Sequence, residues 1–173
     1  DGGIIPDYYA LITKWSGLKF KYDVYDTYED AVSAVADGKS DIFGAFSDGL
    51  IAASQSGLSL TDSISNVNCI LLARPDTNTS DIKNLAIPNK MIDSLRINVD
   101  RLFPNSEIKG YKSARDSFNA VKYGQANASI LGLPGATWLI NQTNSTSYSI
   151  IPVPDLTYDI CAAVDADNQT LCT

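Results

Sequence analysis

The chain has 173 residues, enough for one compact domain or for two small lobes. Hydrophobic residues make up 45% of the chain and charged residues 19%, a composition typical of a folded globular protein. The net charge of −7 argues against a surface for nucleic acid or anionic lipid, because both need positive charge. The absence of histidine removes the commonest general base and the commonest zinc ligand.

The first third of the chain predicts alternating helices and strands. Residues 7–16 have the apolar spacing of a helix, which Gly17 ends. Residues 19–25 alternate apolar and polar side chains, which predicts a half-buried strand. A helix capped by Thr27 and ended by Gly38, a short buried strand at 41–46 and a helix at 50–56 follow.

The rest of the chain continues this alternation. Strands are predicted at residues 67–73, 85–87, 108–111, 128–131, 150–153 and 160–164. Helices are predicted at residues 91–102, 113–124 and 134–141, and Asn168 is expected to cap a further helix. Such alternation favours an α/β fold with a mostly parallel sheet covered by helices.

One helix-to-strand unit occurs twice. Thr27 and Asp30 form a capping box, followed by an apolar pair, a stop glycine at Gly38 and a strand. Ser113 and Asp116 open a second unit with the same features at identical internal spacing. General helix-to-strand units look alike, but the coincidence of four features favours one copy in each of two similar lobes.

Three segments resemble bacterial extracellular solute-binding proteins of family 3, in the order in which that family has them. The opening Asp1-Gly-Gly-Ile-Ile-Pro-Asp7-Tyr-Tyr is similar to the family's glycine-rich segment after its first strand. The second repeat matches a lobe 2 motif at Tyr111, Ser113, Gly124 and Ala128, with Asn127 in place of the usual acid. The tail from Tyr158 to Asn168 is similar to the return strand and the turn before the last helix.

This resemblance implies a two-lobed type II periplasmic-binding-protein fold, in which each lobe has a mixed, mainly parallel sheet flanked by helices. Lobe 1 would comprise residues 1–66 and 157–173 and would be incomplete, whereas lobe 2 would comprise residues 67–156 with the crossing strands. Two hinge strands would join the lobes, and a ligand would bind at the carboxyl ends of strands and the amino ends of helices. The family's first strand and last helices are expected outside residues 1–173.

The resemblance also implies that the groups used to hold an amino acid are altered. The family's carboxylate-binding arginine falls at Ala53, and no arginine occurs before Arg74. Its ammonium-binding aspartate falls at Gly132. Its Gly-Thr pair at the start of the lobe 2 helix is replaced by Lys90-Met91.

Seven residues remain as candidate ligand contacts, and each has a structural alternative. They are Phe46, Ser47 and Asp48 in lobe 1, and Lys90, Met91, Gly132 and Leu133 in lobe 2. Asp48 is equally suited to capping a helix, Phe46 and Met91 to the core, and Lys90 to the solvated surface. We hypothesise that Asp48 and Lys90 face each other across the cleft, where their opposite charges would favour the closed state.

The three cysteines are too widely spaced for a metal or redox motif. Cys69 and Cys161 fall on the two predicted hinge strands, so a disulfide between them is a hypothesis that requires Cα atoms within about 7 Å. Cys172 is an alternative partner for either one or for another chain. Three thiols without a role are the simplest alternative.

The predicted function is an extracytoplasmic ligand-sensing domain, in the periplasm or at the cell surface, that binds a small molecule between lobes and signals by hinge closure. Its host would be a membrane signalling protein such as a histidine kinase or a diguanylate cyclase, anchored through segments outside this chain. The alternative is the substrate-binding protein of an ABC importer. We predict no catalysis, no cofactor, no bound metal and no nucleic-acid partner. A partner domain could take the place of the small-molecule ligand, and a homodimer is a further alternative.

Overall fold

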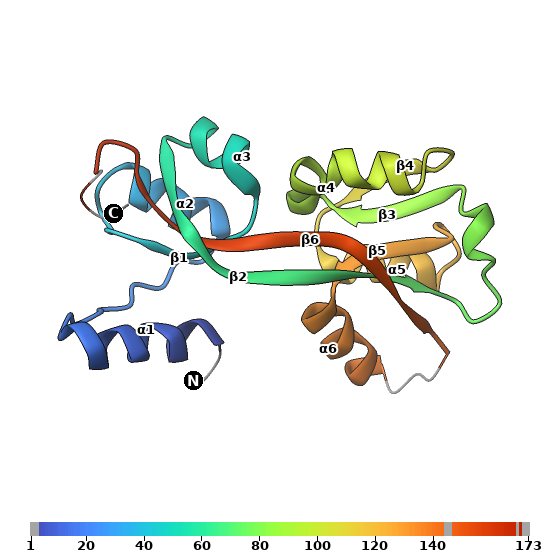
Figure 1. Cartoon of the computed structure of the whole chain (residues 1–173), viewed down its shortest axis with the longest axis horizontal. Coiled ribbons are helices and arrows are strands. Elements are labelled where there is room, and N and C mark those ends of the chain that lie inside the picture. The colour runs from blue at the N-terminus through green and yellow to red at the C-terminus, as the bar shows by residue number, and fades with distance from the viewer. Residues whose placement is uncertain (1–3, 144–146, 169, 171–173) are drawn as a thin grey trace. The chain divides into compact units, whose positions relative to one another are not determined.

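A computed structural model describes residues 4–143, 147–168 and 170. Helices and strands alternate around a six-stranded mixed sheet with the order β1-β6-β2-β5-β3-β4 (Figure 1). The helices are α1 (Ile4–Ser16), α2 (Tyr28–Ala36), α3 (Gly49–Gln55), α4 (Asn89–Leu102), α5 (Ala114–Lys122) and α6 (Leu133–Thr143), with a 3₁₀ turn at Thr79–Asp81. The strands are β1 (Phe43–Phe46), β2 (Leu58–Ala73), β3 (Asn84–Pro88), β4 (Glu107–Tyr111), β5 (Ala128–Gly132) and β6 (Ser149–Asp165).

The chain divides into two compact units. Unit 1 comprises residues 1–46, 52–63 and 161–173, and unit 2 comprises residues 47–51 and 64–160. The long strands β2 and β6 each contribute residues to both units. Two strands and the segment after β1 therefore connect the units.

Unit 2 has a sheet covered by helices on both faces. Strand β3 pairs in parallel with β4 and with β5, and β2 pairs with β5 in the antiparallel direction. Alternate β2 residues enter opposite cores: Leu71 packs with Leu95 and Val99 of α4, whereas Leu72 packs with Phe118 of α5. The apolar run at residues 69–73, which ends β2, follows from this burial on both faces.

Unit 1 has a smaller core around β1. Val32 and Val35 of α2, Phe46 of β1 and Ala53 of α3 pack together, and Ala163 of β6 completes the cluster. The ring of Tyr28 lies 5.1 Å from that of Phe43, which adds an edge-to-face aromatic contact. Strand β1 pairs with β6 in the antiparallel direction, with an irregularity between Phe43 and Phe46.

The two predicted repeats fold in the same way. Thr27 and Ser113 each accept a hydrogen bond from the backbone N–H three residues later and each donate one to the aspartate at that position. At the other ends, Gly38 and Gly124 have φ of 69° and 73°, as a left-handed C-terminal glycine requires. The backbone N–H groups of Lys39 and Gln125 then bond back into the helices over the same 2.8 Å.

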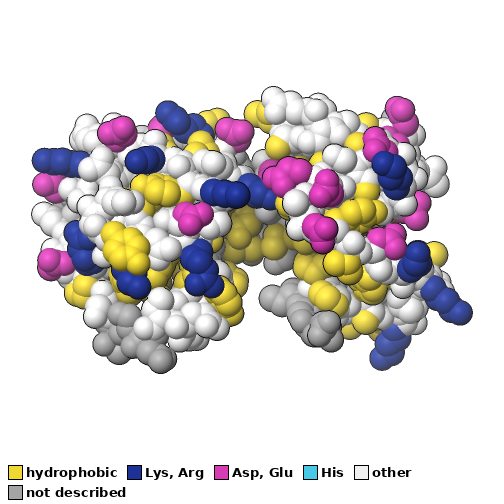
Figure 2. All heavy atoms as spheres, turned by 180° about the vertical axis from the view of Figure 1, so that it is seen from behind, with side chains coloured by type: hydrophobic (Ala, Val, Ile, Leu, Met, Phe, Trp, Pro, Cys, Tyr) yellow, Lys and Arg dark blue, Asp and Glu magenta, His cyan; other side chains and the backbone are white. Residues whose placement is uncertain are grey.

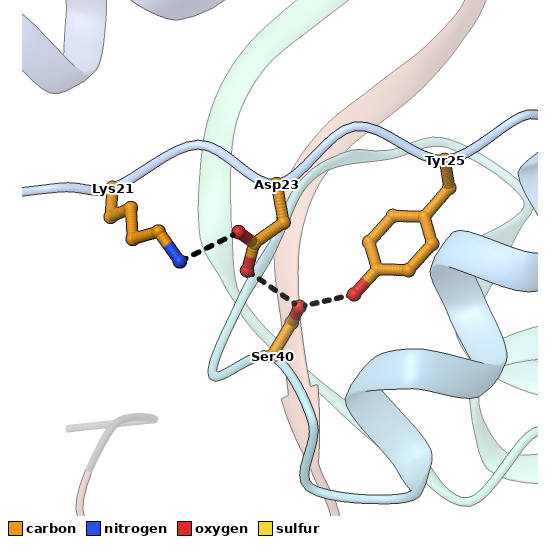
Figure 3. A network of polar contacts seen from close by, with 4 residues as sticks. All are labelled: Lys21, Asp23, Tyr25 and Ser40. Carbon is orange, nitrogen blue, oxygen red and sulfur yellow. Dashed lines mark hydrogen bonds and ion pairs between the residues drawn. The ribbon is translucent and has the colours of Figure 1, made fainter.

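The strand predicted at residues 19–25 is wrong. This segment is extended but is not part of the sheet, and Tyr22 and Val24 are 60% and 93% exposed. Side chains hold it instead, as Figure 3 shows: the Ser40 hydroxyl lies 2.9 Å from the Tyr25 hydroxyl and donates to Asp23, which also pairs with Lys21. The alternation of apolar residues therefore predicted an extended backbone, but it could not show whether this segment pairs with another strand.

The two strands predicted at residues 150–153 and 160–164 are one strand, β6. The strand continues through Pro152 and Pro154, although proline has no N–H to donate to a sheet. β1 pairs with β6 near Cys161 and Ala163, beyond both prolines. The positive φ of 61° at Asp155 marks the local irregularity within this otherwise continuous strand. The helix expected after Asn168 lies largely outside the described residues.

Candidate functional site

The candidate site of unit 2 lies at the carboxyl edge of its parallel strands. Leu85 pairs with Ala128 and Ala86 with Ser129, so β3 and β5 run side by side and end together. Helix α4 follows β3 at Asn89, and α6 follows β5 at Leu133. Backbone N–H groups at helix starts have no partner within the helix, so such an edge can bind oxygen atoms of a ligand.

The start of α4 brings Lys90 and Met91 to this edge. Pro88 occupies the N-terminal cap and makes no side-chain hydrogen bond to the helix. Lys90 is half-buried in the first turn, where its ammonium group adds positive charge. Met91 is only 9% exposed and belongs to the same core cluster as Leu95 and Leu156, so its position favours the core interpretation.

Gly132 and Leu133 form the other side of the edge. Gly132 ends β5 opposite Cys69, whereas Leu133 is 40% exposed at the start of α6. A Cβ atom on Gly132 would lie 2.6 Å from the Tyr158 hydroxyl oxygen and 3.2 Å from Val67 Cγ1. Tyr158 of β6 therefore belongs to the site, although the sequence placed it only on a hinge strand.

The candidates that follow β1 separate into two groups. Phe46 is 2% exposed in the unit 1 core, which favours its core interpretation. Ser47 and Asp48 are half-buried and fall within unit 2, as do Lys90 and its neighbours. The segment approaches α4, because a Cβ on Gly49 would lie 3.5 Å from Ser94 Cβ. Asp48 directly precedes α3, the position that the capping alternative requires.

The position expected for the carboxylate-binding arginine lies in the core of unit 1. Ala53 is fully buried between α3 and the rest of the unit 1 core. An arginine there would bury its charge among apolar side chains. The sequence alone shows that unit 1 has no arginine before the first crossing strand, because the first arginine of the chain is Arg74.

The predicted disulfide between Cys69 and Cys161 is absent, because Cys69 has a free, buried thiol. Cys69 lies opposite Gly132 in unit 2, whereas Cys161 lies opposite Phe46 in unit 1. The two cysteines therefore lie opposite different strands, in different units. Cys172 lies outside the described residues.

Burial raises the pKa of two groups at the site of unit 2. Burial raises the pKa of the Cys69 thiol to about 12, so this thiol is neutral at physiological pH. Burial, and then the proximity of Cys69, also raise the pKa of Tyr158. Among the described residues there is no cluster of three potential metal ligands, and none of their helices has the length and hydropathy to cross a membrane.

The surface shown in Figure 2 has acidic and basic side chains interspersed with hydrophobic ones. Large apolar side chains are exposed on both units, among them Trp15 at 81%, Leu18 at 60%, Ile97 at 85% and Trp138 at 52%. Arg115 lies over the ring of Trp138, with 5.2 Å from its Cζ to the ring centroid. Scattered exposed apolar residues of this kind are common and define no site on their own.

The fold is shared with solved binding domains. The periplasmic VFT2 domain of BvgS from Bordetella pertussis superposes with a TM-score of 0.82 at 20% identity, over 99% of this chain and 74% of that one. This chain has the type II periplasmic-binding-protein fold. No protein-family model and no curated protein sequence matches it.

Two further structures with this fold are ligand-binding proteins. The ligand-binding core of GluR0 in complex with L-glutamate has a TM-score of 0.74 at 16% identity, over 99% of this chain and 79% of that one. The substrate-binding protein of an amino acid ABC transporter has a TM-score of 0.68 at 16% identity, over 96% of this chain and 75% of that one. At these identities the likeness establishes the fold, and the chemistry of the site has to come from this chain's own residues.

Proposed function

We propose that this chain is an extracytoplasmic ligand-sensing domain of a membrane signalling protein. Its site would bind one small molecule, and binding would change the arrangement of its two units. The observation that carries this proposal is the edge of unit 2, where α4 and α6 begin beside each other at the ends of β3 and β5. The periplasmic location of the BvgS domain with this fold supports an extracytoplasmic role.

The polar groups at this edge have distinct tasks in the proposal. The uncapped first turn of α4 and Lys90 would hold negatively charged or carbonyl oxygen atoms of the ligand. Ser47 and Asp48 would contribute from the segment after β1, which belongs to the same unit. Leu133, exposed at the start of α6, would contact an apolar part of the ligand. Phe46 and Met91 would support these residues from the cores.

Binding without catalysis is the simplest use of this site. The chain has no histidine, and the thiol of Cys69, the described cysteine nearest the edge, is buried and protonated. Two of the structures with this fold are ligand-binding or substrate-binding proteins, which supports this interpretation. We therefore infer a function that needs no cofactor and no chemical step in the ligand.

Native mass spectrometry of the chain, purified without unfolding, tests this proposal. We expect a population that carries one small molecule per chain, which is lost after unfolding in guanidinium and restored when the released fraction is added back. Lys90→Glu should reduce the bound population, whereas Lys122→Glu in α5 is the control of equal charge change. Protein mass alone, with no thermal shift from the released fraction, would contradict the proposal.

The substrate-binding protein of an ABC importer is the second candidate, supported by the transporter protein with the same fold. Both functions use the same ligand site, so they differ in what detects the ligand-bound state. A sensor passes it to an effector domain of its own membrane protein, whereas an importer passes it to a permease. Deleting the gene should abolish a transcriptional response to the ligand in the first case and uptake of the radiolabelled ligand in the second.

The location and assembly of the protein follow from the same proposal. A sensor of this kind works in the periplasm or at the cell surface and is anchored by segments outside residues 1–173. A homodimer would allow closure in one copy to reach the other. Alkaline phosphatase fused at residue 173 of the full-length protein should be active only if this domain is exported.

A further inference from the structure

The hydroxyl of Thr61 forms a side-chain link between β2 and β6, which are neighbours in the sheet. Its oxygen accepts a hydrogen bond from the backbone N–H of Ala162 over 3.1 Å. The Asp62 carbonyl lies 2.9 Å from this oxygen and the Ala162 carbonyl 3.3 Å, so the single hydroxyl proton is best placed for Asp62. The hydroxyl therefore connects a backbone donor of β6 to a backbone acceptor of β2.

Such a link marks an irregular point in the pairing of the two strands. In a regular sheet the side chains stand nearly perpendicular to the ladder, and backbone groups pair with backbone groups of the next strand. The hydroxyl of Thr61 reaches into the ladder instead. The spacing between Thr61 and Ala162 therefore depends on a side chain as well as on the backbone.

The link lies close to the boundary between the two units. Thr61 and Ala162 both belong to unit 1, and β2 enters unit 2 at Ile64. Within unit 2, the side-chain amide of Asn66 donates to the carboxylate of Asp159 over 3.1 Å, which forms a second link between the same strands. One side-chain link therefore lies on each side of the boundary.

The section of β2 between these links is weakly held. None of residues 59–66 is buried, whereas residues 69–73 are all buried. The residues between the links are Asp62, Ser63, Ile64 and Ser65, which are mostly short and polar, and aspartate in particular has a low strand propensity. A section with little buried apolar surface has low local stability. The hydrogen bonds between the strands therefore decide how easily this section bends.

We propose that residues 62–65 of β2 are the hinge about which the units change their arrangement, and that Thr61 limits the motion of this hinge. The inference rests on the change of arrangement proposed above. With the hydroxyl link in place, β2 and β6 bend together, because the link holds Ala162 at a fixed spacing. Without it, the strands move more independently. Asn66 and Asp159 limit the other end less strongly, because their link is exposed to water.

Hydrogen exchange at Ala162, resolved by NMR in the ligand-free protein, tests the link. Thr61→Val keeps a β-branched side chain but removes the hydroxyl, so the Ala162 amide should exchange about tenfold faster. Thr61→Ser keeps the hydroxyl and should exchange as the wild type does. Thr157→Val, at the other threonine of these two strands, is the matched control, because its hydroxyl makes no hydrogen bond within the described residues.

Spin-label distances in the ligand-free protein test the hinge itself. With labels at Val24→Cys in unit 1 and Ile97→Cys in unit 2, Thr61→Val should broaden the distance distribution, whereas Thr61→Ser and Thr157→Val should keep the wild-type width. A merely structural role of Thr61 would lower the melting temperature without this broadening. A wild-type width in Thr61→Val would overturn the inference whether or not exchange at Ala162 changes, and equal broadening in Thr157→Val would do so as well.

Asn66→Ala tests the same hinge from its other end. This exposed substitution leaves the cores of both units untouched, and we expect it to broaden the distribution to a smaller extent than Thr61→Val does. No broadening in Asn66→Ala would contradict the limit assigned to the second link.

Failure of this inference can be told apart from failure of the proposed function, because exchange and ligand-free distances need no ligand. If the released small-molecule fraction shifts the distances but Thr61→Val leaves them unchanged, the units move about another place and the sensing function stands. If Thr61→Val broadens the distances but no small molecule binds, the hinge stands and the sensing function is wrong.

Discussion

Thr27 and Ser113 begin helices in different units with the same pair of hydrogen bonds. Each hydroxyl accepts from a backbone N–H at 3.1 Å and donates to an aspartate carboxylate, at 2.6 Å for Thr27 and 2.7 Å for Ser113. The glycines that end these helices are equivalent as well. The two units therefore share a local folding motif, which the sequence predicted from spacing alone.

Removing either cap should destabilise the protein. Thr27→Ala and Ser113→Ala each leave backbone N–H groups of the first turn without their side-chain partner, and each should lower the free energy of unfolding by about 1 kcal/mol. Ser33→Ala, at an exposed site within α2, is the matched control and should have little effect or a slightly stabilising one. Urea unfolding followed by circular dichroism measures all three, and wild-type stability in both cap variants would contradict the motif's role.

A side chain at Gly110 should displace its neighbours. A Cβ there would collide with Asn89 Oδ1 at the start of α4 and would lie 2.8 Å from Ile92 Cδ1. Both atoms end side chains that can move, so we expect Gly110→Ala to cost about 1 kcal/mol of stability and to disturb the α4 end of the candidate site. Gly135→Ala is the control, because no atom lies within 4 Å of its Cβ position. Equal melting temperatures for the two variants would count against this packing.

The protein should lose stability at alkaline pH through Tyr9. Burial raises the pKa of Tyr9 from 10.0 to about 12, so the folded state keeps a proton that the unfolded chain releases. Unfolding then becomes easier as pH rises from 10 to 12, because the unfolded state binds fewer protons.

Tyr9→Phe should flatten this decline, although it also removes the hydrogen bond from Tyr9 to the Gly44 carbonyl and so lowers stability slightly at neutral pH. The buried Cys69 thiol should account for the loss of stability that remains above pH 9 in this variant, because its pKa is also raised in the folded state. Thermal melts from pH 8 to pH 11.5 measure the slope, with Tyr123→Phe for comparison. Identical slopes for Tyr9→Phe and the wild type would be inconsistent with the assigned pKa of Tyr9.

Ser40 should hold the extended segment at residues 19–25. Its hydroxyl joins Tyr25 and Asp23, so Ser40→Ala should increase amide hydrogen exchange across this segment several-fold. Lys21→Ala removes only an exposed ion pair and should change exchange little. Mass spectrometry of exchanged peptides distinguishes these outcomes, and unchanged exchange in Ser40→Ala would show that other contacts order the segment.

Local signals in the sequence predicted most of the elements. Caps, stop glycines and apolar spacing act within a few residues, so α2, α5 and their connections to strands were predictable. Whether an extended segment pairs depends on distant strands, which explains why residues 19–25 were misjudged as a strand. The continuity of β6 through Pro152 and Pro154 depended on its neighbours in the same way.

The candidate site was predictable in part. The resemblance to family 3 solute-binding proteins, which implies a ligand at strand ends, suggested Lys90, Gly132 and Leu133, and their role stays a prediction. Phe46 and Met91 are buried in the cores of their units. Their apolar residue type could not distinguish a core position from a ligand contact. Tyr158 was missed because its relationship with Gly132 joins β6 to β5, and no local pattern reports such a contact.

The central claim is that a small molecule bound by this chain changes the arrangement of its units, and electron–electron distance measurements test it most directly. Spin labels at Val24→Cys in unit 1 and Ile97→Cys in unit 2 would lie on side chains that are 93% and 85% exposed. The protein would be measured after its bound molecules are removed by unfolding and refolding, and again with the released fraction added back. The account predicts a shifted and narrower distance distribution with the ligand, and an identical distribution at saturation would contradict it.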